Sequence, residues 1–261
     1  MTTPLTSTLS ARGRVGRALL LGVTVVLFAA RAAAQPAPAS APTSMPQHMM
    51  VEDPFNHALL LDQLEANETD SGRDVRWDAS AWVGHAFDRL AIRTEGSETA
   101  GKTEHAELQL LWAHTIARWW DLVTGVREDF APHPSRGWAA FGVQGIAPYR
   151  FDIEATAFVG DGGDSAARVK AEYELLITQR WILQPRVELN WYGQGDAVRG
   201  LGPGFSSSET ALRLRYEIRR EVAPYVGIVR ERKHGGTADF ARAAGDDPDD
   251  TRLVAGIRMR F

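Results

Sequence analysis

The chain has 261 residues, a formal net charge of −4 and no cysteine. The lack of cysteine excludes disulfide bonds and thiolate sites for a metal or a nucleophile. The acidic balance argues against a nucleic-acid partner and is compatible with a cation partner.

Residues 1–34 have the composition of an export signal. Three arginines precede an apolar run over 18–30, and alanines occupy 32–34 just before Gln35. A basic start, a short apolar core and small residues at a cleavage site are typical of a secretory signal peptide. The apolar run is shorter than the about 20 residues that a membrane-spanning helix needs. Removing the four arginines of residues 1–34 changes the net charge from −4 to −8.

Residues 35–54, QPAPASAPTSMPQHMMVEDP, are dominated by proline, alanine and serine. This composition predicts a disordered arm rather than part of a folded core. The remainder, 55–261, contains no linker and is predicted to be one domain.

Apolar and polar residues alternate throughout 55–261. In FDIEATAFVG (151–160) the odd positions are apolar, and Asp152, Glu154 and Thr156 lie between them. A period of two is typical of a strand with one apolar and one polar face. Charges at every second position would scatter around a helix, so a helical interpretation fails. The recurring alternation predicts twelve strands, near 57–67, 75–84, 89–96, 103–116, 119–130, 137–146, 151–160, 167–178, 182–192, 208–219, 222–233 and 251–261.

The length of these strands favours a membrane barrel over a soluble sandwich. About ten tilted residues cross the hydrocarbon layer, whereas sandwich strands usually have about five or six. The joints between successive strands are of two kinds that alternate along the chain. One kind is tight, as in AR, APYR and RRE, and the other kind includes the long segments 193–207 and 234–250. An even strand number with short periplasmic turns is typical of outer-membrane proteins. We therefore predict an all-β, transmembrane, antiparallel up-and-down β-barrel of about 12 strands, with the apolar face toward lipid and both termini in the periplasm.

Four stretches then resemble one known family. They are DPFNHALLLDQLE (53–65), WAAFGVQGIAPYRFDIEATAFVG (138–160), LRLRYEIRREVAPYVGI (212–228) and ERKHGGTADFARAAGDDPDDTRLVAGIRMRF (231–261). The sequence resembles the copper resistance protein B family over 53–261. This resemblance implies an outer-membrane barrel of Gram-negative bacteria that serves copper resistance or homeostasis. It also implies copper ions, as Cu(I) or Cu(II), outer-membrane lipid and a periplasmic copper-handling protein as partners.

The arm and the lumen each contain candidate metal ligands. Thioethers suit Cu(I), and imidazole binds copper in either oxidation state. The segment MPQHMM supplies three sulfurs and one imidazole, and His57 follows nine residues after His48. His105 and Glu107 are expected to point into the lumen. The candidate ligands are therefore Met45, His48, Met49, Met50, His57, His105 and Glu107. The alternatives are a linker with incidental methionines and lumen charges that simply pair across strands.

No catalytic constellation emerges from the alternation. A lipid hydrolase needs a serine, a histidine and an orienting acid on one face at one depth. His105 has no serine partner suggested by the alternation. We therefore expect a non-enzymatic barrel that binds or conducts copper ions, with a general small-solute channel as the alternative.

Overall fold

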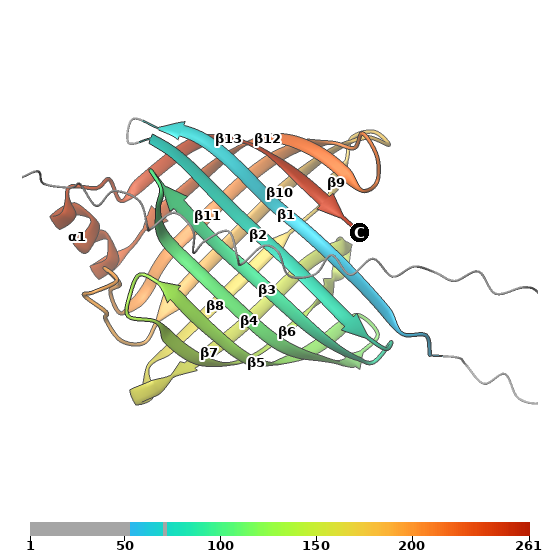
Figure 1. The fold of residues 1–261 in the computed structure, drawn as a ribbon, viewed down its shortest axis with the longest axis horizontal. Coiled ribbons are helices and arrows are strands. Elements are labelled where there is room, and N and C mark those ends of the chain that lie inside the picture. The colour runs from blue at the N-terminus through green and yellow to red at the C-terminus, as the bar shows by residue number, and fades with distance from the viewer. Residues whose placement is uncertain (1–52, 70–71) are drawn as a thin grey trace, which may run out of the picture. The chain divides into compact units, whose positions relative to one another are not determined.

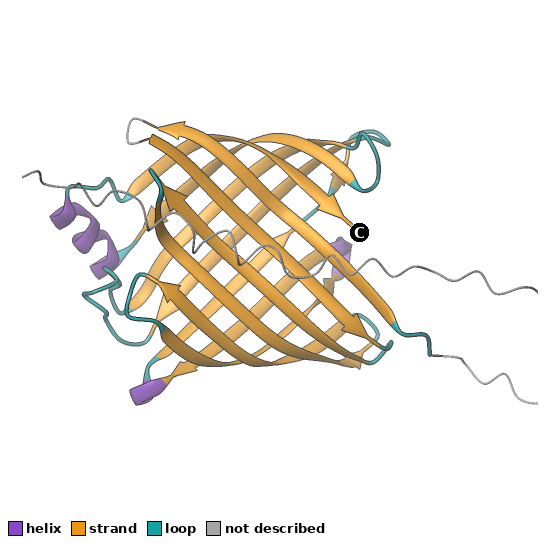
Figure 2. Cartoon of the chain, viewed as in Figure 1, coloured by secondary structure: helices purple, strands orange, loops and turns teal. Residues whose placement is uncertain are grey.

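A computed structural model describes residues 53–69 and 72–261. The predicted signal peptide lies outside these residues, as does the predicted arm apart from Asp53 and Pro54. The described chain is almost entirely β-sheet (Figures 1 and 2). Its strands are β1 (Asn56–Thr69), β2 (Gly72–Gly84), β3 (Asp88–Thr99), β4 (Lys102–Ala117), β5 (Trp120–Ala131), β6 (Arg136–Ala147), β7 (Phe151–Gly160), β8 (Ser165–Glu172), β9 (Leu175–Leu176), β10 (Trp181–Tyr192), β11 (Gly204–Tyr216), β12 (Val222–Lys233) and β13 (Asp249–Arg260).

These strands close into one antiparallel barrel. Each pairs with its neighbours in chain order, and β13 pairs with β1 to close the cylinder. The backbone N–H of Leu59 donates to the carbonyl of Phe261 at 2.9 Å, which extends this closure to the last residue. Because β8 and β9 both pair with β10, they form one barrel strand interrupted at residues 173–174. The predicted barrel of twelve strands is confirmed.

The predicted faces of the strands are also confirmed. Val126 and Phe141, on the apolar face of β5 and β6, are 57% and 59% exposed. Arg127, next to Val126, is buried inside the barrel. A row of exposed large apolar side chains around the outside is unfavourable in water and favourable against lipid. The alternation therefore positions charged side chains such as Arg127 in the lumen.

Apolar side chains share the interior with these charges. Leu111, Trp138, Ala140 and Phe158 form one buried cluster. The indole Nε1 of Trp138 donates a hydrogen bond to Asp129 Oδ2 at 2.9 Å, so this large ring also satisfies a buried carboxylate. Side chains thus fill much of the barrel, as expected for a cylinder of this strand number.

The two ends of the barrel differ. At one end, which we call the short-joint rim, strands are joined by 85–87, 118–119, the 3-10 turn η2 (Pro148–Arg150), 177–180 and 217–221. The opposite end, called the long-loop end, carries short joints between the early strands, the turn η3 (Asp161–Gly163), and the long segments 193–203 and 234–248. Long joints are thus confined to the last two connections of that end.

The segment 234–248 contains a helix that the alternation did not predict. Helix α1 (Gly235–Ala244) ends at Gly245, whose φ of 88° is readily adopted only by glycine. The hydroxyl of buried Thr237 accepts a hydrogen bond from the Gly202 N–H and contacts Ser206 Oγ, each at 2.8 Å. These bonds fasten α1 to the segment before β11. No helix in the described ranges is long and apolar enough to span a membrane.

Candidate functional site: the charged lumen

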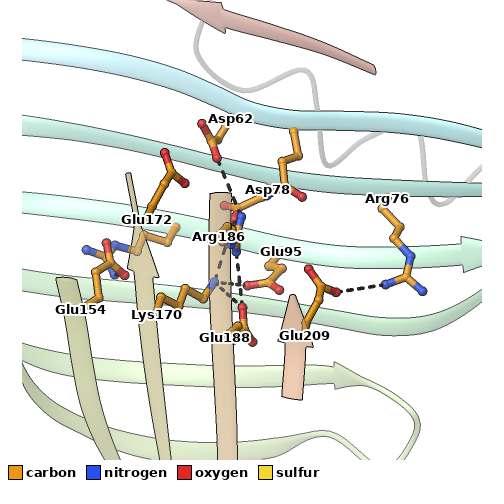
Figure 3. A network of polar contacts seen from close by, with 12 residues as sticks. Asp62, Arg76, Asp78, Glu95, Glu154, Lys170, Glu172, Arg186, Glu188 and Glu209 are labelled. Atoms are coloured by element: carbon orange, nitrogen blue, oxygen red, sulfur yellow. Dashed lines mark hydrogen bonds and ion pairs between the residues drawn. The ribbon is translucent and has the colours of Figure 1, made fainter. Parts of the chain in front are cut away.

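Charged side chains from strands on opposite walls meet in the middle of the lumen (Figure 3). Lys170 Nζ on β8 lies 2.8 Å from Glu95 Oε2 on β3 and 3.4 Å from Glu188 Oε2 on β10. The guanidinium of Arg186 on β10 lies 3.2 Å from Asp78 Oδ2 on β2. Removing charges from water is costly unless they are paired, so these contacts stabilise the side chains in the lumen.

A second set of contacts joins β4 to β8. Arg168 donates from Nη1 and Nη2 to the two oxygens of Glu107, at 2.8 and 3.0 Å. Arg127 Nη2 lies 2.8 Å from Glu107 Oε2, and its Nε donates to Asp129 at 2.6 Å. Two guanidiniums therefore share the Glu107 carboxylate. Together with the contacts of Lys170 and Arg186, these pairs form the layer that we call the central ion-paired layer.

The central ion-paired layer lies between two cavities. The larger, of about 630 Å³, reaches the short-joint rim, where Trp119 and Gly145 line it. The smaller, of about 320 Å³, reaches the long-loop end, where Leu201 and Thr237 line it. Asp78, Glu95, Arg168 and Arg186 line both cavities. The ion pairs of these residues therefore form the partition between the two cavities.

Two carboxyl groups in the larger cavity lie on neighbouring strands. Asp152 on β7 and Glu172 on β8 are direct cross-strand partners. In the described part of the chain neither forms an ion pair; Glu172 Oε1 accepts a hydrogen bond from Gln184 Nε2 at 2.5 Å. Directly opposed like charges destabilise a sheet. A cation between them would offset this repulsion, so we call Asp152 and Glu172 the carboxylate pair.

The predicted lumen ligands do lie near each other. His105 Nε2 is 3.3 Å from Glu107 Oε2, so this pair of candidate ligands lies together in the lumen. Because Arg168 and Arg127 already neutralise Glu107, its carboxylate is a poor ligand for an added cation. His57 is exposed near the start of β1, at the short-joint rim, whereas His105 lies near the start of β4, toward the long-loop end.

The described residues contain no cluster of three or more histidines or carboxylates arranged to hold a metal ion. Met45, His48, Met49 and Met50 lie outside the described residues, and their predicted role stays a prediction.

Two features of the site were missed at the level of the sequence. Asp62 faces the lumen because β1 has an irregularity between Leu61 and Gln63, which shifts the alternation within the strand. Its Oδ1 lies 2.8 Å from Arg258 Nε.

The second missed feature is a contact between a serine and a histidine. Ser208 Oγ lies 2.9 Å from His234 Nε2, and the His234 ring stacks on Phe205. By alternation, position 208 belongs to the lipid-facing side of β11. No spacing in the sequence indicates that its side chain meets His234.

One loop carboxylate holds the segment 193–203 together. Asp196 accepts hydrogen bonds from the backbone N–H groups of Val198 and Arg199, and Arg199 Nη1 donates to it at 2.9 Å. Partial burial alone would raise the pKa of Asp196, but the hydrogen bonds from Arg199 outweigh this and hold the pKa below its ordinary value. Arg136 Nη1 also reaches Asp196, at 3.3 Å.

Comparison with known sequences identifies the family. The family model described as copper resistance protein B precursor matches residues 55–261. The chain belongs to this family. The copper resistance protein B homolog of Pseudomonas syringae pv. tomato is 48% identical over 219 residues, covering 84% of this chain and 74% of that protein. Copper resistance protein B of Escherichia coli is 45% identical over 214 residues, covering 82% and 72%.

Family membership gives the chain a role in copper resistance and confirms the resemblance seen in its sequence. A search of solved structures finds the NanC porin, with a TM-score of 0.51 and 12% identity, covering 78% of this chain and 100% of that chain. At this identity the likeness concerns the fold alone, and it agrees with a porin-like barrel.

Proposed function

We propose that this protein is an outer-membrane barrel that passes copper ions through its lumen as part of copper resistance. The carboxylate pair is the observation that carries this proposal, because it places two opposed carboxyl groups in the larger cavity with no ion-pair partner among the described residues. Membership of the copper resistance protein B family indicates that the cation is copper. Both termini and the short-joint rim face the periplasm in this account, since short turns are periplasmic in outer-membrane barrels.

Weak binding suits an ion that must enter and leave. Copper prefers imidazole and sulfur ligands to carboxylates, so Asp152 and Glu172 would attract a copper ion without trapping it. Asp62 lines the same cavity, but Arg258 and Arg186 lie close to it. The carboxylate pair is therefore the transient cation site of the larger cavity.

The central ion-paired layer favours a selective path over a general solute channel. Lys170 and Arg186 connect opposite walls between the two cavities. Passage of a sugar-sized solute would require several of these buried pairs to break together, and each broken pair leaves a buried charge. A small cation needs only a local rearrangement and can exchange carboxylate partners as it passes.

The segment with Met45, His48, Met49 and Met50 is proposed to capture copper before it enters the lumen. Three thioethers and an imidazole within six residues form a soft donor set. The acidic mature chain raises the local concentration of cations. A periplasmic copper-handling protein is the partner expected to exchange copper with this segment.

We propose that the protein acts without catalysis. The contact between Ser208 and His234 supplies two members of a hydrolase triad. Among the described residues no hydrogen bond reaches Nδ1 of His234, so the hydrogen bond that orients the histidine of a triad is not formed. Release of fatty acid from phospholipid by the purified barrel, abolished by Ser208→Ala, would contradict this part of the proposal.

Two measurements test the proposed function. Proteoliposomes that contain the full mature chain should take up copper ions but exclude a small neutral sugar. Equal uptake of both would support the general small-solute channel instead. Protease added to intact cells should cleave 193–203 or 234–248 and spare the joint Pro148–Arg150; the reverse pattern would invert the proposed orientation.

A further inference from the structure

The short-joint rim carries a ring of exposed arginines. Arg118 and Arg150 lie in the joints β4–β5 and β6–β7, and Arg180 lies in the joint before β10. Arg219 and Arg220 occupy the joint β11–β12, and Arg260 ends β13. All six side chains are exposed. The ring therefore contains a basic residue in four of the five joints of this end.

Among the described residues, these arginines differ from the lumen arginines in having no acidic partner. Within the described residues, none of the six lies within ion-pairing distance of a carboxylate, whereas lumen arginines such as Arg168 and Arg186 are paired. At the long-loop end, Arg199 pairs with Asp196 and Arg230 with Asp249. Unneutralised positive charge is thus concentrated at one rim of the barrel.

Exposed apolar side chains accompany the arginines. Each of the five joints of this rim contributes one, and each is more than half exposed: Phe87, Trp119, Tyr149, Ile177 and Ile218. The Arg118 guanidinium lies 5.3 Å from the ring centroid of Trp119. Amphipathic rings and snorkelling arginines are typical of the boundary between hydrocarbon and headgroups. The rim therefore has the composition of a membrane interface.

The joint β6–β7 adopts a costly backbone to present its side chains. Tyr149 and Arg150 have φ values of 66° and 67°, in the left-handed region that favours glycine. Tyr149 is nevertheless 86% exposed and Arg150 is exposed. Neither side chain packs into the barrel, so packing does not account for large residues at these two positions. Both side chains are available to contact a surface outside the protein.

We propose that the short-joint rim binds the headgroups of anionic phospholipids through these arginines. A guanidinium donates two parallel hydrogen bonds to a phosphate, and the adjacent apolar side chains enter the acyl region. Joints 118–119, 148–150, 177–180 and 217–221 carry five arginines against two glutamates, which leaves them net positive. This inference rests on the proposed placement in a membrane and does not depend on copper handling.

Native mass spectrometry of the full mature chain in a neutral detergent tests this proposal. The protein is supplied with equal amounts of phosphatidylglycerol and phosphatidylcholine, without copper. The rim variant is R118Q/R150Q/R219Q/R220Q. The matched control is R199Q/R230Q/R232Q/R242Q, which removes the same charge from the long-loop end. Heat-dependent gel migration verifies that each variant is folded.

The parent and the matched control should retain phosphatidylglycerol about fivefold or more over phosphatidylcholine, and the rim variant should lose this preference. No preference in the parent, or an unchanged preference in the rim variant, would overturn the proposal. An equal loss in the matched control would show that net charge alone is responsible. Displacement of the lipid by excess inorganic phosphate would assign the rim to the free ion, and displacement by polyglutamate would assign it to an acidic protein.

Because the binding is measured in detergent and without copper, a negative result would leave the proposed function intact. Conversely, failure of copper uptake in proteoliposomes would leave the lipid proposal standing. The two experiments therefore separate the two proposals.

Discussion

Arg168 and Glu107 form a bidentate hydrogen-bonded ion pair across the lumen, although three strands separate β8 from β4 around the barrel wall. The pair therefore links distant parts of the cylinder directly. Both side chains are buried, so the pair is shielded from the screening that weakens surface ion pairs. The contact between Lys170 and Glu95, in the same central ion-paired layer, likewise links β8 to a distant strand, β3.

Breaking this pair should destabilise the barrel. Glu107→Gln leaves the buried Arg168 and Arg127 without their shared carboxylate and should lower the free energy of unfolding by about 3–5 kcal/mol. Urea unfolding in lipid vesicles measures the loss. The double variant Glu107→Leu with Arg168→Met is the control, since Arg127 keeps Asp129 as a partner. A double variant less stable than the single one would contradict this interpretation.

The lipid face should reject charge. Leu212 is exposed on the outer face of β11. Leu212→Arg should cost about 2–4 kcal/mol near the bilayer midplane and reduce assembly. Leu212→Met, an apolar change of similar volume, should be nearly neutral. Folding yield into vesicles compares the two, and equal yields would show that this face does not meet lipid.

The alternation of residues was sufficient to predict twelve strands and the faces of regular strand segments, because strand periodicity is local. It did not predict which charges pair, because those contacts join residues far apart in the chain. Arg213 illustrates the difference. Its inward direction follows from parity, but its contacts with Glu65 at 2.8 Å and Gln63 at 3.0 Å require the closed barrel.

Two further features could not be predicted for physical reasons. The irregularity that turns Asp62 inward breaks the period of two on which the prediction depends. Helix α1 is short, and its contacts with Gly202 and Ser206 come from another segment of the chain. Isolated helices of this length are marginal in water, so α1 depends on tertiary contacts.

The order of segment 193–203 should depend on pH through Asp196. Its pKa is held below the ordinary value by Arg199, so its stabilising effect is complete above about pH 4 and is lost as pH falls through the folded-state pKa. Limited proteolysis of this segment should accelerate below about pH 4 in the parent. Asp196→Asn should be cleaved at one rate throughout. A parent rate independent of pH would contradict the role of Asp196.

The arm should account for tight Cu(I) binding. Replacing Met45, His48, Met49 and Met50 with serine removes all of the soft donors predicted in the arm. Titration of the purified protein with Cu(I) against a chromogenic chelator should show at least about a tenfold loss of affinity, while barrel folding stays unchanged. Unchanged affinity would make the arm a linker and direct the search to His105 and Glu107.

The most direct test of the account is copper uptake by proteoliposomes that contain the variant D152N/E172Q. The parent and the control variant D239N/D246N, which removes the same charge from the long-loop end, should take up copper at equal rates. Replacing the carboxylate pair by amides should slow uptake about tenfold, because the larger cavity loses two carboxyl groups that can attract a cation. Uptake by D152N/E172Q at the rate of the parent would contradict passage of copper past Asp152 and Glu172.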